Sequence, residues 1–150
     1  VTRVEGAVFV ALHSSSPRRR IVNGTISAGP LDFVARIFQE SAEEEIRILV
    51  THHPLAPLPD GGGGRVLPGN DLALDRLRNM RVDLVLSGHL HRSFVTYSSE
   101  VCGGHAGNGE IPIVHSGTAT SNRGRMAEKG RNSLNGSLYH VLQEIFIFPK

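Results

Sequence analysis

The chain has 150 residues, of which 16 are basic and 14 acidic, giving a formal net charge of +2. This length suits a single domain with a real hydrophobic core, and so small a net charge produces no large field that would attract nucleic acid or a membrane surface. A single cysteine excludes an internal disulfide and a four-cysteine zinc module, which favours a cytoplasmic location. No apolar segment approaches the roughly 20 residues that span a bilayer.

The first third of the chain predicts a strand, a loop and a helix. The sequence starts at Val1 with no signal or transit pattern, and we expect it to be a piece of a longer protein. The short apolar run at residues 4–12 predicts a buried strand. Apolar residues at helical spacing predict a helix over residues 30–44, with Pro30 at its first position.

The middle and end of the chain continue this alternation and then change. A buried strand is expected at residues 46–51, and a helix over residues 71–80, capped by Asn70, follows a loop rich in proline and glycine. The next strand covers residues 82–87. Alternating strands and helices predict a parallel α/β sheet, and the late strands predict an antiparallel part or a second sheet. These late strands are expected within residues 93–99, 111–118 and 137–148.

Histidines directly follow two of the expected strands. His52 and His53 come after the strand at residues 46–51, and His89 and His91 come after the strand that ends at residue 87. The carboxyl ends of strands in open α/β sheets meet at one edge, where ligands bind. The right-handed crossover through the intervening helix brings these two strands close together. Neutral imidazoles clustered at such an edge are what a metal site needs.

The spacing of the second histidine pair gives a further expectation. His89 and His91 are two residues apart, so they face the same side if the backbone stays extended. Gly88 lets the chain turn sharply and approach whatever lies between the strand ends. A His-x-His segment alone is equally compatible with a structural or surface role. Its combination with the earlier pair favours a metal site.

The segments LVTHHPL and VDLVLSGHLHR resemble the last two signature motifs of the calcineurin-like metallophosphoesterases. The segments ALHSS and IPIVHSGTAT are similar to other strand-end stretches of that family. The resemblance implies an α/β fold in which residues 1–150 form the second, C-terminal half of a four-layer αββα sandwich with mixed sheets. It also implies two divalent metal ions, such as manganese, iron or zinc, that clamp a phosphoryl group at the strand ends.

The resemblance also implies roles for individual residues. His52 and His89 would ligate one metal ion and His91 the other. His53 would pack or hydrogen-bond, although position alone does not decide which member of the pair is the ligand. No catalytic residue is assigned in this chain. The candidate pocket residues are His53, Gly88 and His115, the last with a buried, hydrogen-bonded role as the alternative.

The earlier motifs of the family, Asp-x-His, Gly-Asp-x-x-Asp and Gly-Asn-His, are missing from the sequence. These motifs supply carboxylate and asparagine ligands, so we expect residues outside this chain to complete the metal centre and the chain alone to be inactive. The expected function is hydrolysis of a small phosphomonoester or phosphodiester. The alternative is a non-catalytic metal-binding or protein-interaction module. An uncovered side of the sheet would lead the chain to form a homodimer or to pair with its missing N-terminal half.

Three other groups have a plain structural interpretation beside a functional one. Asp60, in the glycine-rich loop, could swing toward the metal centre, but an acid in such a loop is typical of a turn. Ser14 beside His13 suggests a nucleophile and a base, but no acid orients the histidine. Cys102 and His105 are spaced like half of a zinc knuckle, and the other half is missing. The simpler interpretations are a turn residue for Asp60, a strand end for His13 and Ser14, and a plain loop for Cys102 and His105.

Overall fold

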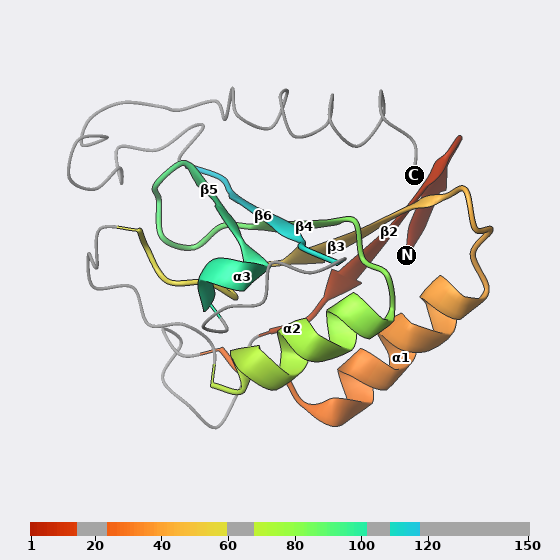
Figure 1. Cartoon of the computed structure of the whole chain (residues 1–150), viewed down its shortest axis with the longest axis horizontal. Coiled ribbons are helices and arrows are strands. Elements are labelled where there is room, and N and C mark those ends of the chain that lie inside the picture. The colour runs from red at the N-terminus through yellow and green to blue at the C-terminus, as the bar shows by residue number, and fades with distance from the viewer. Residues whose placement is uncertain (15–23, 60–67, 102–108, 118–150) are drawn as a thin grey trace.

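The computed structural model describes residues 1–14, 24–59, 68–101 and 109–117. Within these residues the chain forms one six-stranded mixed sheet and three helices (Figure 1). The elements are β1 (Thr2–Val4), β2 (Ala7–Leu12), α1 (Ala28–Gln39), β3 (Ile46–Thr51), α2 (Asn70–Asn79), β4 (Leu84–Ser87), β5 (Phe94–Tyr97), α3 (Ser98–Val101) and β6 (Pro112–His115).

The sheet has the order β1-β2-β3-β4-β6-β5. The four central strands are parallel, and β1 and β5 are antiparallel edge strands. The predicted α/β class with a mixed sheet is therefore confirmed, and the expected antiparallel part belongs to the same sheet. The described residues contain no second sheet, and the expected strand at residues 137–148 lies outside them. No helix among them has the length and apolar character needed to cross a membrane.

The strand predicted at residues 4–12 is confirmed over Ala7–Leu12, but residues 4–6 belong to a hairpin. Val4 pairs with Ala7, and Gly6 sits between the strands with a φ of +76°. A left-handed backbone conformation of this kind costs glycine little and other residues more. The run of apolar residues gives no sign that the chain changes direction, and only Gly6 indicates the turn.

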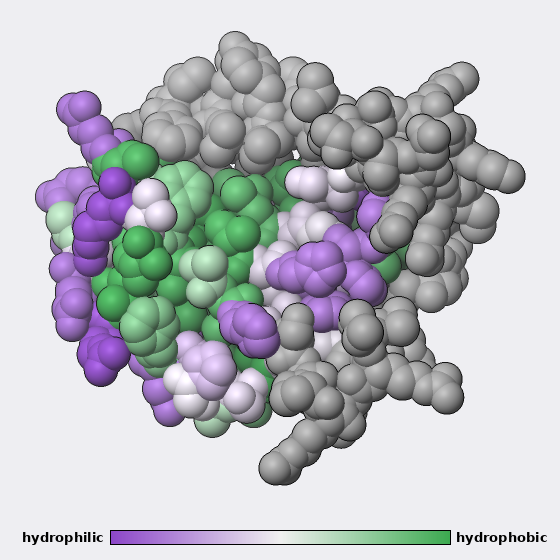
Figure 2. Space-filling view, turned by 180° about the vertical axis from the view of Figure 1, so that it is seen from behind, coloured by the Kyte–Doolittle hydropathy of each residue, from purple (hydrophilic) through white to green (hydrophobic). Residues whose placement is uncertain are grey.

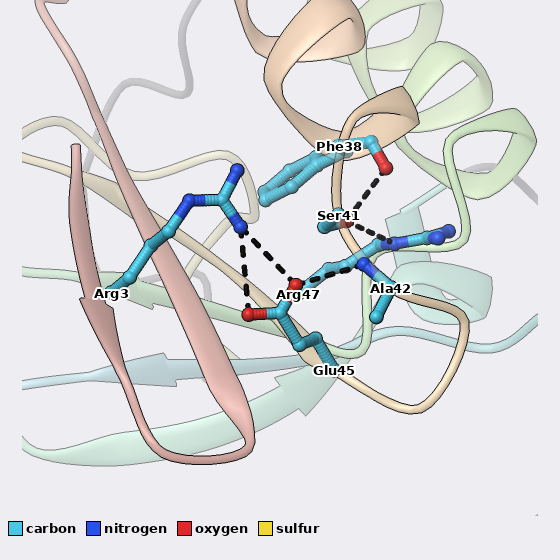
Figure 3. Close-up of polar contacts among 6 residues, drawn as sticks. All are labelled: Arg3, Phe38, Ser41, Ala42, Glu45 and Arg47. Atoms are coloured by element: carbon cyan, nitrogen blue, oxygen red, sulfur yellow. Dashed lines mark hydrogen bonds and ion pairs between the residues drawn. The ribbon is translucent and has the colours of Figure 1, made fainter.

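The helix predicted over residues 30–44 ends earlier, at Gln39. Ser41 Oγ donates to the Phe38 carbonyl at 2.7 Å, and the Ala42 N–H donates to Glu45 Oε2 at 2.8 Å (Figure 3). Glu45 also pairs with Arg3 at 3.1 Å. The acidic run therefore forms a turn whose side chains satisfy backbone groups after the helix, instead of a further helical turn.

The second predicted helix is confirmed within one residue at each end, but its predicted cap is wrong. Gly69 is the N-cap, with a φ of +79°, and Asn70 is the first helical residue. Asn70 Nδ2 donates to the Leu55 carbonyl at 3.2 Å. The side chain that favoured a capping role therefore ties the helix to the loop after β3.

The two faces of the sheet carry different apolar clusters. Helices α1 and α2 cover one face (Figure 1), and there Val8, Phe38 and Leu49 belong to the main core together with Leu74 and Leu77. A smaller cluster lies on the other face, where Figure 2 shows apolar residues gathered at the surface. Its buried members are Ala7, Ile48, Leu84 and Val114, and partly buried Phe9, Ile46, Val50, Leu86 and Val95 pack against them.

Arg47, in β3, stabilises the ends of both long helices. Its Nε donates to Ser41 Oγ at 3.2 Å, and its Nη1 donates to the Met80 carbonyl at 3.1 Å. Ser41 follows the end of α1, and Met80 is the C-cap of α2. A cation at helix C-termini interacts favourably with the carbonyl groups that lack a helical partner.

We expect Arg47→Met to lower the free energy of unfolding by about 1–3 kcal/mol, because the change removes hydrogen bonds from a charged, partly buried donor. Urea denaturation followed by circular dichroism measures this. Arg81→Met is the matched control, because the Arg81 side chain is 69% exposed and pairs with exposed Glu43. The control should change stability by less than about 1 kcal/mol. Equal effects of the two changes would contradict the role of Arg47.

Candidate metal centre

The two histidine-bearing strand ends lie side by side. Strands β3 and β4 are parallel neighbours, with Val50 opposite Leu86 in the last registered pair. Beyond the strands, the Gly88 N–H donates to the His52 carbonyl at 3.2 Å. The sheet therefore brings the segments after both strands to one edge, as the alternation of strands and helices predicts.

Three imidazole rings gather at this edge. His52 Nε2 and His89 Nδ1 are 3.1 Å apart and share a hydrogen bond. The ring centroid of His53 lies 4.9 Å from that of His52 and 4.7 Å from that of His89. One ring nitrogen of each residue lies within 4.8 Å of the others, a spacing at which the group could hold a metal ion.

The distance between His52 and His89 fits a shared metal ion. Zinc–imidazole bonds of about 2.0–2.1 Å in tetrahedral geometry separate two ligand nitrogens by about 3.3 Å. The two nitrogens are 3.1 Å apart, so they would have to separate by only a small distance to bind one ion. A metal ion would replace the proton that the two rings share, because a ligand nitrogen must be deprotonated. Nitrogen donors of this kind suit zinc, iron, nickel or copper, and carboxylates suit manganese better.

The expected extended arrangement of His89 and His91 is wrong. His89 has a φ of +71° and His91 a φ of +54°, and the Leu90 N–H donates back to the Gly88 carbonyl at 2.8 Å. The chain turns sharply here, and the buried side chain of Leu90 is directed into the protein. His91 does not belong to the three-histidine group, and its assignment to a second metal ion stays a prediction. Non-glycine residues in this region cost of order 1–3 kcal/mol each and cluster at functional sites.

His53 is buried and held by Ser14. Its side chain ring Nδ1 lies 2.9 Å from Ser14 Oγ, and its backbone N–H donates to the same oxygen at 3.2 Å. His53 therefore makes the hydrogen bonds expected of it, and which member of the His52–His53 pair is a metal ligand stays a prediction. His13, which the sequence placed beside Ser14 as a possible base, is exposed.

Gly24 lies against both Ser14 and His53. A Cβ atom at Gly24 would overlap the Ser14 carbonyl oxygen and come within 2.5 Å of His53 Nδ1. Sequence spacing did not predict Ser14 and Gly24 as partners of His53. The signal for Ser14 is the parallel register, since Leu12 lies opposite Thr51 and two further residues on each strand reach Ser14 and His53. No pattern in the sequence indicates that Gly24 is a neighbour of His53.

His115 lies inside the protein at the end of β6. Ser87 Oγ is 2.7 Å from His115 Nδ1, and the Phe94 ring stacks on the imidazole with centroids 4.0 Å apart. The residue has no exposed surface. This arrangement matches the buried, hydrogen-bonded alternative. Burial lowers the pKa of His115 from 6.5 to about 4.

The lowered pKa of His115 gives a pH-dependent stability. The folded protein keeps this imidazole neutral, whereas the unfolded chain protonates it below about pH 6.5, so stability is full above that pH and falls as the pH drops toward 4. The loss across this window is about 3 kcal/mol. Urea denaturation at several pH values should show it, and His115→Gln should flatten the profile between those pH values. An unchanged slope in the variant would contradict the assignment.

Carboxylates are missing from the three-histidine group. Among the described residues, the group that could hold a metal ion contains only His52, His53 and His89. Asp83 lies at the opposite end of β4 and accepts the Arg47 backbone N–H at 2.9 Å. Asp60, Cys102 and His105 lie outside the described residues.

A cavity of about 440 Å³ lies at the other end of the sheet. Phe38, Arg47 and Met80 line it, together with Ala35, Gln39, Arg76, Asn79 and Arg81. It is therefore next to the C-termini of α1 and α2 and the amino end of β3. Ligands of parallel α/β sheets bind at the carboxyl ends of the strands. The histidine edge is thus the better candidate site, and Arg47 in this cavity serves the helix ends.

The mixed sheet and its helices define an α/β protein, in which the histidines at the ends of two neighbouring parallel strands could hold a metal ion. The comparison with protein families makes the class specific, because the calcineurin-like phosphoesterase model matches residues 8–93, more than half of the chain. The chain belongs to this family. The matched region runs from β2 past β4 and includes His52, His53, His89 and His91. The chain matches no curated protein.

Proposed function

We propose that this chain supplies the histidine ligands of a metal-dependent hydrolase that cleaves small phosphomonoesters or phosphodiesters. Family membership supports phosphoester chemistry. The observation that carries the proposal is the 3.1 Å separation of His52 Nε2 and His89 Nδ1 at the ends of adjacent parallel strands. Fold alone would not support a reaction. The spacing of these two imidazole nitrogens, which fits one shared metal ion, is what supports this one.

In this proposal His52 and His89 hold one divalent ion, and His91 contributes to a second. The bound ions supply Lewis acidity toward the phosphoryl oxygens. The turn at Gly88 and the bond from its N–H to the His52 carbonyl hold the two strand ends together. In this proposal acidic ligands from residues outside this sequence complete the centre, because the group found among the described residues contains imidazoles alone.

The apolar face opposite α1 and α2 suggests where those residues pack. The cluster around Ile48 and Leu84 lies on β3 and β4, the strands whose ends carry the histidines. A segment that covers this face therefore reaches the metal edge over a short distance. We propose that this segment is the part of the longer protein that carries the acidic ligands. The competing proposal is that a second copy of the chain covers this face. A sedimentation experiment on the isolated chain would then show a homodimer.

The test is an assay of the natural full-length protein with added manganese. Bis(p-nitrophenyl) phosphate and p-nitrophenyl phosphate are the two probes. We expect manganese-dependent turnover that falls at least about 100-fold in His52→Ala and in His89→Ala, because the loss of a ligand costs at least as much as the loss of a group that orients one. His13→Ala, which alters an exposed histidine outside the group, should keep its activity.

Two results would count against the proposal. Equal turnover of the wild-type protein and His52→Ala would show that hydrolysis does not use this edge. Zinc or manganese binding without hydrolysis of either probe would favour the alternative, a non-catalytic metal-binding module. The histidine-only composition of the group is the observation that favours this alternative.

A further inference from the structure

We propose that Ser14 is a positioning residue that fixes the tautomer of His53, so that His53 serves as a hydrogen-bond donor beside the metal ion and not as its third ligand. This inference rests on the proposed function, since it assigns the third histidine of the same site. The spacing alone treats His52, His53 and His89 as equivalent. The hydrogen bonds of Ser14 distinguish His53 from the other two.

The Ser14 hydroxyl has one proton to donate and can accept two hydrogen bonds. The His53 backbone N–H must donate to Oγ, so Oγ is an acceptor in that bond, at 3.2 Å. The second contact, 2.9 Å to His53 Nδ1, has two possible directions. Ser14 is only 2% exposed, so its hydroxyl proton needs an acceptor within the protein.

Among the described residues, His53 Nδ1 is the potential acceptor within hydrogen-bond distance of this hydroxyl, at 2.9 Å. Donation from Oγ to Nδ1 uses the proton and leaves no buried donor unsatisfied. Nδ1 is then the unprotonated nitrogen of a neutral imidazole, and the proton of the ring is on Nε2. In the opposite arrangement, Nδ1–H and the backbone N–H both donate to Oγ, and the buried hydroxyl proton loses this acceptor. Such a loss costs about 1–3 kcal/mol.

The surroundings of His53 keep the ring in this orientation. Gly24 leaves no space between its own backbone and the ring, so the imidazole lies against the wall formed by Gly24 and Ser14. A half-turn of the ring would replace Nδ1 by a carbon and break the bond to Ser14. The ring lies 4.7 Å from that of His89 and 4.9 Å from that of His52.

The primary test is the tautomer of His53 in the metal-free chain. Long-range proton–nitrogen NMR of the chain labelled with ¹⁵N-histidine distinguishes protonated from unprotonated ring nitrogens. A His53→Gln variant assigns the signals. At mildly alkaline pH we expect Nε2 of His53 to be protonated and Nδ1 to be unprotonated. Protonation of Nδ1 would overturn the inference, and this result does not depend on any substitution of Ser14 or on enzyme activity.

The role of Ser14 is tested by two substitutions. Ser14→Thr keeps the hydroxyl and should keep the tautomer, whereas Ser14→Ala should give a mixture of the two tautomers. Ser87→Ala is the matched control, because it removes an equivalent serine from His115 and should leave the His53 signals unchanged. An unchanged His53 tautomer in a folded Ser14→Ala variant would contradict the positioning role.

Addition of zinc separates this inference from the proposed function. If both hold, the ring nitrogens of His52 and His89 shift to positions typical of metal ligands, and the Nε2–H of His53 persists. Conversion of His53 Nε2 to a ligand would overturn the inference and leave the metal site in place. Absence of any zinc-dependent shift at His52 and His89 would contradict the metal site, while the tautomer of His53 would still decide the role of Ser14.

Discussion

His52→Ala and His89→Ala should each weaken zinc binding to the chain by at least about 100-fold. The two ring nitrogens are 3.1 Å apart, close to the separation of two ligands on one tetrahedral zinc ion. In the part of the chain that the structure describes, the group contains no carboxylate that could replace either ring. Loss of a group that merely orients a ligand costs 10–100-fold in metal affinity, and loss of the ligand costs at least as much. Competition with a chromophoric chelator measures the affinity.

Two controls accompany this measurement. His13→Ala removes an exposed histidine outside the group and should bind zinc as the wild-type chain does. The double variant His52→Ala with His89→Ala should weaken zinc binding by less than the product of the two single-variant effects, because both rings serve the same ion. Wild-type affinity in either single variant, with the fold intact by circular dichroism, would contradict the site.

Gly24→Ala should destabilise the protein and displace His53. A Cβ atom there would overlap the backbone carbonyl of Ser14 and the His53 ring, and neither is the end of a flexible side chain that can move away. Forcing atoms into a filled space costs typically 1–3 kcal/mol. The expected result is a loss of this size in the free energy of unfolding, together with a shifted NMR signal for His53.

Gly29→Ala is the matched control for this substitution. Gly29 lies in α1, and a Cβ atom there would meet no atom within 4 Å. Alanine is about 1 kcal/mol more favourable than glycine in a helix interior, so this variant should be as stable as the wild-type protein or more so. A Gly24→Ala variant as stable as Gly29→Ala would show that Gly24 does not form the wall behind His53.

The features that follow from periodicity and strand order could be predicted from the sequence. The apolar runs before His52 and His89 predicted two buried parallel strands, and the helix between them predicted that their carboxyl ends meet at one edge. Both expectations agree with the structure. The family resemblance rested on the segments that contain these histidines, and the matched family region includes them.

The features that depend on a single backbone conformation or on a distant partner could not be predicted. The hairpin at Gly6 and the left-handed residues His89 and His91 follow from turns that an apolar or alternating pattern does not reveal. The bond between Ser14 and His53 joins residues 39 positions apart and depends on the register of β2 against β3. Sequence spacing therefore identified the edge of the sheet but did not distinguish the roles of the three rings.

The most direct test of the metal centre is a crystal structure of the chain grown with zinc and measured at the zinc absorption edge. We predict an anomalous peak between His52 Nε2 and His89 Nδ1, about 2.0–2.1 Å from each nitrogen. The His53 ring should remain bonded to Ser14. A zinc ion bound elsewhere, with the hydrogen bond between His52 and His89 intact, would contradict the account.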